Sequence, residues 1–115
     1  MQEKRKFVRI PESLKISYHT MPTTKIRDYL TKDIGQGGVR FFLHEFVPKG
    51  SLLKIKITFE KMHFSLEALV KVVWVKEDSF GQRYEAGVEF VEIPQEAVRY
   101  LIKYIKAFFG IMKLV

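Results

Sequence analysis

Cysteine is absent from the 115-residue sequence, which excludes disulfide bridges and thiolate metal sites and fits a reducing compartment. The sequence also lacks an apolar run of about 20 residues, the length that a membrane-spanning helix needs. Its N-terminus is charged from Glu3 to Lys6 and carries no apolar core of the kind found in secretory signals. These absences predict a cytoplasmic location without a transmembrane segment.

No linker rich in proline, glycine or serine divides the chain, and 115 residues can bury one hydrophobic core but not two of ordinary size. Hydrophobic residues make up 47% of the sequence, including ten phenylalanines, so the chain has ample apolar material for a core. We therefore expect one domain over residues 1–115.

Acidic residues are in the minority, because 20 Lys and Arg face 13 Asp and Glu and give a formal net charge of +7. This balance favours anionic partners in general, such as nucleotides, nucleic acid, acidic proteins or membrane surfaces, and does not choose among them. The three histidines, His19, His44 and His63, are widely separated, so the sequence holds no metal-ligand pattern. No motif indicates a catalytic centre or a cofactor, and we do not expect an enzyme.

Apolar and polar residues alternate in several short segments, as in strands with one buried face. The clearest segment is 53–59, whose apolar positions are Leu53, Ile55, Ile57 and Phe59. A less regular strand is expected over 25–31. The segment after Phe64 keeps the period for so long that a bulge is expected before Trp74, which should lie in the core or flank a base. About six such strands imply an antiparallel sandwich or barrel, here over residues 12–92, because closure removes exposed strand edges.

From Pro94 the apolar residues recur at three- and four-residue steps, which predicts an amphipathic helix over residues 94–113. We expect this helix to pack against the barrel and close an open end. Alternatively, its last apolar residues extend past the barrel and dock a second subunit, a partner protein or an acidic membrane. The residues concerned are Phe108, Phe109, Ile111, Met112 and Leu114. Docking of a second subunit there would give a homodimer.

Two arginines, Arg5 and Arg9, lie four residues apart in the segment 1–11, which we expect to be a flexible arm. The forked donors of a guanidinium can meet N7 and O6 of guanine together, and they also bind phosphate. Because Ile10 precedes Pro11, the arm should be extended near its end. Extended geometry would put both guanidiniums on one face, roughly 13 Å apart, which suits a dinucleotide better than a single phosphate.

A glycine-rich turn follows at residues 33–38, with the sequence Asp-Ile-Gly-Gln-Gly-Gly. Ionised Asp33 only accepts hydrogen bonds, so it suits the N–H donors on the Watson–Crick edge of guanine. Gly37 and Gly38 permit unusual backbone conformations and close approach of a ligand, and successive backbone N–H groups there can bind phosphate. Arg40 follows the turn and, if it faces outward, adds a cation beside the phosphates.

Together the two motifs resemble the signature of the PilZ family, bacterial receptor domains for the dinucleotide cyclic di-GMP. That signature is Arg-x-x-x-Arg on an N-terminal arm and Asp/Asn-x-Ser-x-x-Gly on a barrel turn. The resemblance also covers the segments 70–75 and 84–90, and so most of the chain. It implies a mostly β fold, a six-stranded antiparallel split barrel with a C-terminal helix. We expect seven ligand-binding residues, of which Arg40 is added as a cation beside the phosphates. They are Arg5, Arg9, Asp33, Gly35, Gly37, Gly38 and Arg40.

Gly35 departs from the family pattern, which usually has serine at this position. A neutral hydrogen bond contributes about 1 kcal/mol net, so the missing hydroxyl is expected to weaken binding several-fold to about tenfold.

The expected function is that of a cyclic di-GMP receptor or adaptor, in which ligand draws the arm onto the barrel and creates a surface for a partner protein. Two alternatives remain open. A divergent adaptor would keep the barrel and act by protein contact without nucleotide, which Gly35 favours slightly. A small basic barrel would bind single-stranded nucleic acid, but most aromatic residues fall at apolar positions that we expect to be buried, which counts against base stacking.

Overall fold

The computed structural model describes residues 9–20, 27–78 and 83–114. The strands are β1 (Arg9–Ile10), β2 (Lys15–Thr20), β3 (Arg27–Gly35), β4 (Gly38–Leu43), β5 (Leu52–Phe59), β6 (Phe64–Glu77) and β7 (Tyr84–Glu92). A short 3-10 turn, η1 (Glu60–Met62), follows β5, and the helix α1 (Gln95–Leu114) follows β7. Arg5 lies outside the described residues.

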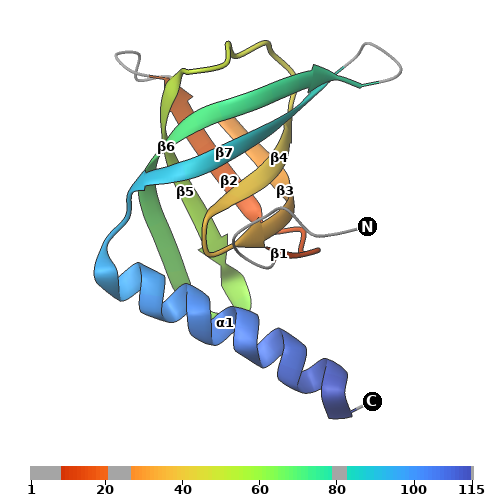
Figure 1. Cartoon of the computed structure of the whole chain (residues 1–115), viewed down its shortest axis with the longest axis vertical. Helices are drawn as coiled ribbons and strands as arrows, with labels where there is room; N and C mark the ends of the chain where they lie inside the picture. The colour runs from red at the N-terminus through yellow and green to blue at the C-terminus, as the bar shows by residue number, and fades with distance from the viewer. Residues whose placement is uncertain (1–8, 21–26, 79–82, 115) are drawn as a thin grey trace.

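Within the described part of the chain, six of the strands close an antiparallel barrel (Figure 1). Their order is β3-β2-β5-β6-β7-β4, and β4 pairs back with β3. The additional strand β1 pairs with the end of β3. The predicted fold, a mostly β six-stranded antiparallel barrel with a C-terminal helix, is therefore confirmed.

Strand β3 shows why the alternation of its sequence is irregular. The expected strand covered residues 25–31, whereas β3 continues to Gly35 and forms the entry to the glycine turn. A register shift between Thr31 and Asp33 interrupts its pairing with β4. Such a bulge adds a residue to one strand and breaks the two-residue period on which the sequence argument depends.

The barrel core follows the predicted alternation most clearly in β5, where Leu53, Ile55, Ile57 and Phe59 are buried. Strand β6 contains the expected bulge, because its register with β7 shifts between Val72 and Trp74. After the shift Val75 packs against the core, and Trp74 lies over Gly87 of β7. The bulge therefore turns Trp74 to the outer surface of the barrel.

Helix α1 lies across one end of the barrel, and its C-terminal part extends past the strands (Figure 1). Leu101 is fully buried, and the Tyr100 ring stacks on Phe64 with centroids 3.7 Å apart. Phe109 is 38% exposed. The first half of the helix thus covers the barrel end. Docking by its last residues stays a prediction, because the side chains after residue 110 lie outside the described part.

The helix is also tied to the segment that links β1 to β2. The Tyr104 hydroxyl donates a hydrogen bond to Oε2 of Glu12 at 3.2 Å. The Glu12 carbonyl accepts a hydrogen bond of 2.6 Å from the Thr31 hydroxyl of β3.

Within the described stretches, no helix combines the length and apolar character of a membrane span.

Candidate functional site

The end of the N-terminal arm lies beside the glycine turn. Arg9 pairs with Gly35 and Ile10 pairs with Ile34, so β1 adds to the last two residues of β3. Both isoleucines are fully buried, and this apolar anchor fixes the backbone at Arg9 against the barrel. Two segments that the sequence singled out separately therefore meet in space.

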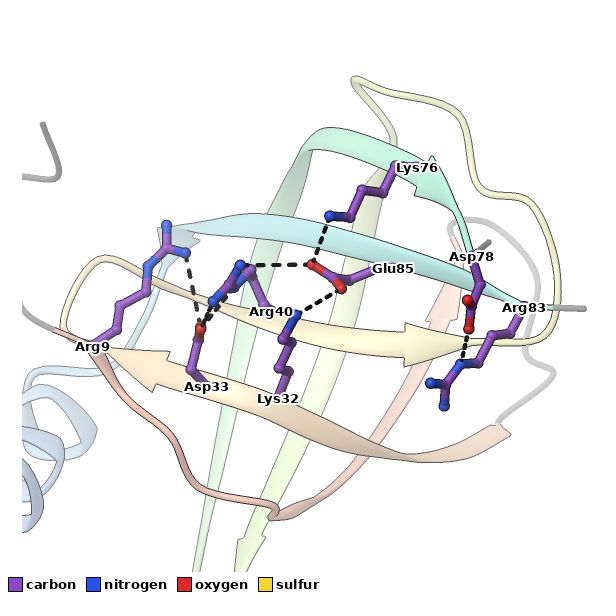
Figure 2. Close-up of polar contacts among 8 residues, drawn as sticks. All are labelled: Arg9, Lys32, Asp33, Arg40, Lys76, Asp78, Arg83 and Glu85. Carbon is purple, nitrogen blue, oxygen red and sulfur yellow. Dashed lines mark hydrogen bonds and ion pairs between the residues drawn. The ribbon is translucent and has the colours of Figure 1, made fainter. Parts of the chain in front are cut away.

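Asp33 is the buried acid of this site, with only 7% of its side chain exposed. It lies directly opposite Arg40 in the pairing of β3 with β4. Oδ2 of Asp33 accepts a hydrogen bond of 2.7 Å from Nε of Arg40 and a second one from Nη2 of the same guanidinium. Nη1 of Arg9 approaches Oδ1 from the other side at 3.8 Å (Figure 2). Two of the predicted arginines thus flank the predicted carboxylate.

Oδ1 of Asp33 is a buried atom that accepts no hydrogen bond from the described residues, and Oε2 of Glu85 on β7 is a second one. Buried carboxylate oxygens are normally satisfied by hydrogen bonds, since water is excluded from them. A buried acceptor beside a partly exposed arginine is well placed to receive an N–H donor from a ligand. Arg9 is 26% exposed, so a ligand that displaced its side chain would reach this oxygen.

A second buried carboxylate, Glu85 of β7, lies next to Arg40 and was not identified from the sequence. Its Oε1 accepts a hydrogen bond from Nζ of Lys32 at 3.1 Å. Its Oε2 lies 3.7 Å from Nη1 of Arg40 and 3.9 Å from Nζ of Lys76. In Figure 2 these side chains form a chain of alternating charge that runs from Arg9 across β3, β4 and β7. Four cations surround two carboxylates, which leaves two net positive charges.

The outer wall beside this cluster is built by the bulge in β6. Lys76 pairs with Glu85, and Trp74 pairs with Gly87 two residues along the same two strands. A side chain at Gly87 would meet the Trp74 ring, with Nε1 at 2.3 Å from the added Cβ. Trp74 was expected in the core or beside a base, and its position on the outer face puts it next to the charged cluster.

Gly37 and Gly38 play structural parts that the sequence argument did not anticipate. Neither has the positive φ that only glycine adopts easily. A Cβ at Gly38 would lie 2.0 Å from the carbonyl oxygen of Val88, so glycine lets β4 approach β7 closely. The carbonyl of Gly37 accepts a hydrogen bond of 3.1 Å from the backbone N–H of Phe90.

Other parts of the described surface offer less chemistry. A groove of about 800 Å³ is lined by residues of β2, β5 and β6, of the end of β7, and of the segment that leads into α1. It contains Lys54, Lys56 and Glu67, and none of the residues of the charged cluster. No group of three or more His, Asp or Glu in the part of the chain that the structure describes could hold a metal ion.

The described residues thus form a closed β-barrel in which the short strand β1 pairs with the end of β3 at a glycine turn. The model of the PilZ domain matches residues 3–107, and the chain therefore belongs to the PilZ family. A search of curated proteins gave no significant match.

Three solved structures illustrate the likeness of the fold. The Bacillus subtilis inhibitor of motility MotI/DgrA has a TM-score of 0.81 at 19% identity, over 95% of this chain and 53% of that protein. The Escherichia coli YcgR complex with c-di-GMP has a TM-score of 0.79 at 12% identity, over 96% and 48%. The K. pneumonia MrkH complex with c-di-GMP has a TM-score of 0.80 at 15% identity, over 97% and 55%. The chain thus spans about half the length of these proteins.

Proposed function

We propose that this PilZ domain is a receptor for cyclic di-GMP, without catalytic activity or cofactor, in the cytoplasm. The observation that carries the proposal is the buried Oδ1 of Asp33, which accepts no hydrogen bond from the described residues and lies 3.8 Å from the Arg9 guanidinium. The remaining ligand-binding residues in the proposal are Arg5, Gly35, Gly37, Gly38 and Arg40.

The chemistry of this arrangement suits a guanine dinucleotide. Oδ1 of Asp33 can accept from the N1–H or the 2-amino group of guanine, which are donors on its Watson–Crick edge. Arg9 can bind N7 and O6 of guanine or a phosphate. The two net positive charges of the cluster complement the two phosphates of the ligand, and such charge-assisted contacts are stronger than neutral ones.

Signalling would follow from the position of β1. Ligand held between Arg9 and Asp33 would draw the arm onto the barrel, and the new surface would be recognised by a partner protein. The likeness to YcgR and MrkH, each solved with c-di-GMP, supports the ligand.

Isothermal titration calorimetry with cyclic di-GMP tests the proposal. We expect saturable binding at micromolar concentration or below, and a loss of at least tenfold in affinity in both Arg9→Ala and Asp33→Asn, because charge-assisted hydrogen bonds contribute about 1.5–3 kcal/mol. Arg99→Ala is the matched control, since Arg99 is an exposed arginine of α1. Absence of binding by the unaltered domain would reject the receptor.

The divergent adaptor remains the second candidate, because Arg40 already occupies Oδ2 of Asp33 and Gly35 lacks the motif hydroxyl. In that case the domain would act through α1, either on a partner protein or as a homodimer. Light scattering at two protein concentrations tests the homodimer. The same titration with a single-stranded oligonucleotide at two salt concentrations tests nucleic-acid binding, which weakens steeply with salt when it is nonspecific.

A further inference from the structure

Burying the Glu85 carboxylate costs this barrel free energy. Glu85 belongs to β7, and its carboxylate lies on the outer side of the barrel, where only 7% of the side chain is exposed. A buried carboxylate destabilises the fold unless cations and hydrogen bonds compensate its lost hydration. Here the compensation comes from three cations, Lys32, Arg40 and Lys76. Two of them are more than 40% exposed, but Arg40 is held more deeply, at 26%.

Arg40 is therefore shared between two buried acids. Its Nε and Nη2 donate to Oδ2 of Asp33, and its Nη1 faces Oε2 of Glu85 at 3.7 Å. A guanidinium is planar and carries its donors in a rigid fork, so contacts on both sides fix its orientation. Figure 2 shows the Arg40 head group between the two carboxylates.

The orientation of Arg40 decides which oxygen of Asp33 is left without a hydrogen bond. Because Arg40 takes Oδ2 with two donors, Oδ1 is left as the acceptor that faces Arg9. If the Arg40 head group rotated, it could donate to both oxygens of Asp33 and remove that acceptor. The contact with Glu85 opposes such a rotation, since it attracts Nη1 away from Asp33.

We propose that Glu85 is a positioning residue for guanine recognition, which acts through Arg40 to leave Oδ1 of Asp33 as an acceptor for the ligand. The inference rests on the proposed function, because it concerns how the same site distinguishes guanine from adenine. Guanine presents the N1–H donor to Oδ1, whereas adenine presents an unprotonated N1 with a lone pair. A site built around a fixed acceptor rejects the base that lacks the donor.

The test compares the affinities of Glu85→Gln for cyclic di-GMP and cyclic di-AMP. Glutamine keeps the size of the side chain and removes its charge, which alone would strengthen the binding of any anion. Both dinucleotides carry the same charge, so this general effect cancels in the ratio of their dissociation constants. We expect the preference for cyclic di-GMP to fall about fivefold to tenfold, the change that corresponds to about one hydrogen bond.

Two further variants separate positioning from a general structural role. Glu67→Gln is the matched control, because Glu67 is an exposed residue of β6 in the groove away from the cluster, and it should keep the preference unchanged. Arg40→Lys keeps a cation but loses the fork, so it should lower the preference as Glu85→Gln does. If Glu85 acts through Arg40, the double variant should lose no more than Arg40→Lys alone.

The outcomes are distinct. If the unaltered domain binds cyclic di-GMP and prefers it, an unchanged ratio in folded Glu85→Gln overturns the role of Glu85 and leaves the receptor in place. If the losses add in the variant that combines Glu85→Gln with Arg40→Lys, Glu85 does not act through Arg40. If Glu85→Gln does not fold, Glu85→Asp replaces it in the same comparison with Arg40→Lys. If the unaltered domain binds neither dinucleotide, the proposed function and this inference both fall. Trp74, the single tryptophan of the sequence, lies two residues from Lys76, which pairs with Glu85, and provides a fluorescence signal for the titrations.

Discussion

Gly38 shows how a residue of the PilZ motif can be required by the packing of the barrel. Because the nearest atoms to an added Cβ are backbone atoms of β7, with the Val88 carbonyl oxygen at 2.0 Å, the strand itself would have to move. We expect Gly38→Ala to lower the free energy of unfolding by about 1–3 kcal/mol, the usual cost of overpacking. Urea denaturation measures this change. In Gly110→Ala the new Cβ meets open space on α1, and the same measurement should show a gain of about 0.5–1 kcal/mol. Equal stability of Gly38→Ala and the unaltered domain would contradict the steric account.

Gly35 carries the second prediction at the scale of one residue. Gly35→Ser restores the hydroxyl that the PilZ pattern usually has, next to Arg9, its partner in the pairing of β1 with β3. We expect the dissociation constant for cyclic di-GMP to fall several-fold to about tenfold, as one added hydrogen bond allows. Calorimetry on the two proteins decides the point, and an unchanged constant would show that the hydroxyl has no part in this turn.

The sequence singled out several residues of the charged cluster, but it did not give their partners. Asp33 and Arg40 were both identified, yet their direct contact depends on the β3–β4 register, which is shifted by the bulge after Thr31. Glu85 lies far along the chain from both, in a strand that the alternation did predict. Nothing in a two-residue period tells which strands become neighbours, so the cluster around Glu85 emerges only from the closed barrel.

At the scale of the elements, α1 was predicted with nearly its observed start, and its contact with the barrel involves a titrating group. The pKa of Tyr104 is raised to about 12, first by burial and then by the Glu12 carboxylate beside it. In the unfolded chain the pKa stays near the ordinary value of 10.0. Above that pH the unfolded state loses this proton while the folded state keeps it. The stability that Tyr104 contributes is therefore complete below about pH 10 and is lost as the pH rises to about 12.

Tyr104→Phe tests this link between α1 and the segment before β2. At about pH 7 the variant should be less stable by about 1 kcal/mol, because it lacks the hydrogen bond to Glu12. The difference from the unaltered domain should shrink between about pH 10 and about pH 12, when urea denaturation is repeated across that range. Tyr100→Phe is the matched control, since the buried Tyr100 hydroxyl has no hydrogen-bond partner in the described part and its removal should not destabilise. If the unaltered domain became more stable relative to Tyr104→Phe as the pH rose, the raised pKa of Tyr104 would be contradicted.

The bulge in β6 shows why elements were easier to predict than the faces they present. The length of the alternating segment indicated a bulge before Trp74, and one lies there. The sequence did not give the direction in which the following side chains turn, because that depends on how the shifted strand pairs with β7. Its effect is that Trp74 and Lys76 join the outer surface beside Glu85.

For the whole molecule, the charge of +7 is less informative than its distribution. Part of the positive charge lies around Asp33 and Glu85. The buried acids hold these cationic side chains in fixed positions, so the cations cannot rearrange along a flexible polyanion. The aromatic rings include a buried set, Phe41 and Phe59 among them, that no base could reach. Both features favour a small dianionic ligand over single-stranded nucleic acid.

The stability of the whole domain then provides a test of whether one ligand engages both the arm and the turn. A ligand present at about 100 times its dissociation constant stabilises the folded state by about 2.7 kcal/mol, which raises the melting temperature of a domain of this size by on the order of 10 °C. We expect this rise with cyclic di-GMP in differential scanning calorimetry, and a much smaller one in Arg9→Ala at the same concentration. GMP at twice that concentration supplies the same bases without the link between them, so it lacks the gain in effective concentration and should raise the melting temperature little. An equal rise with GMP would mean that the site reads a single nucleotide, and that Arg9 and the turn do not form one cradle for a dinucleotide.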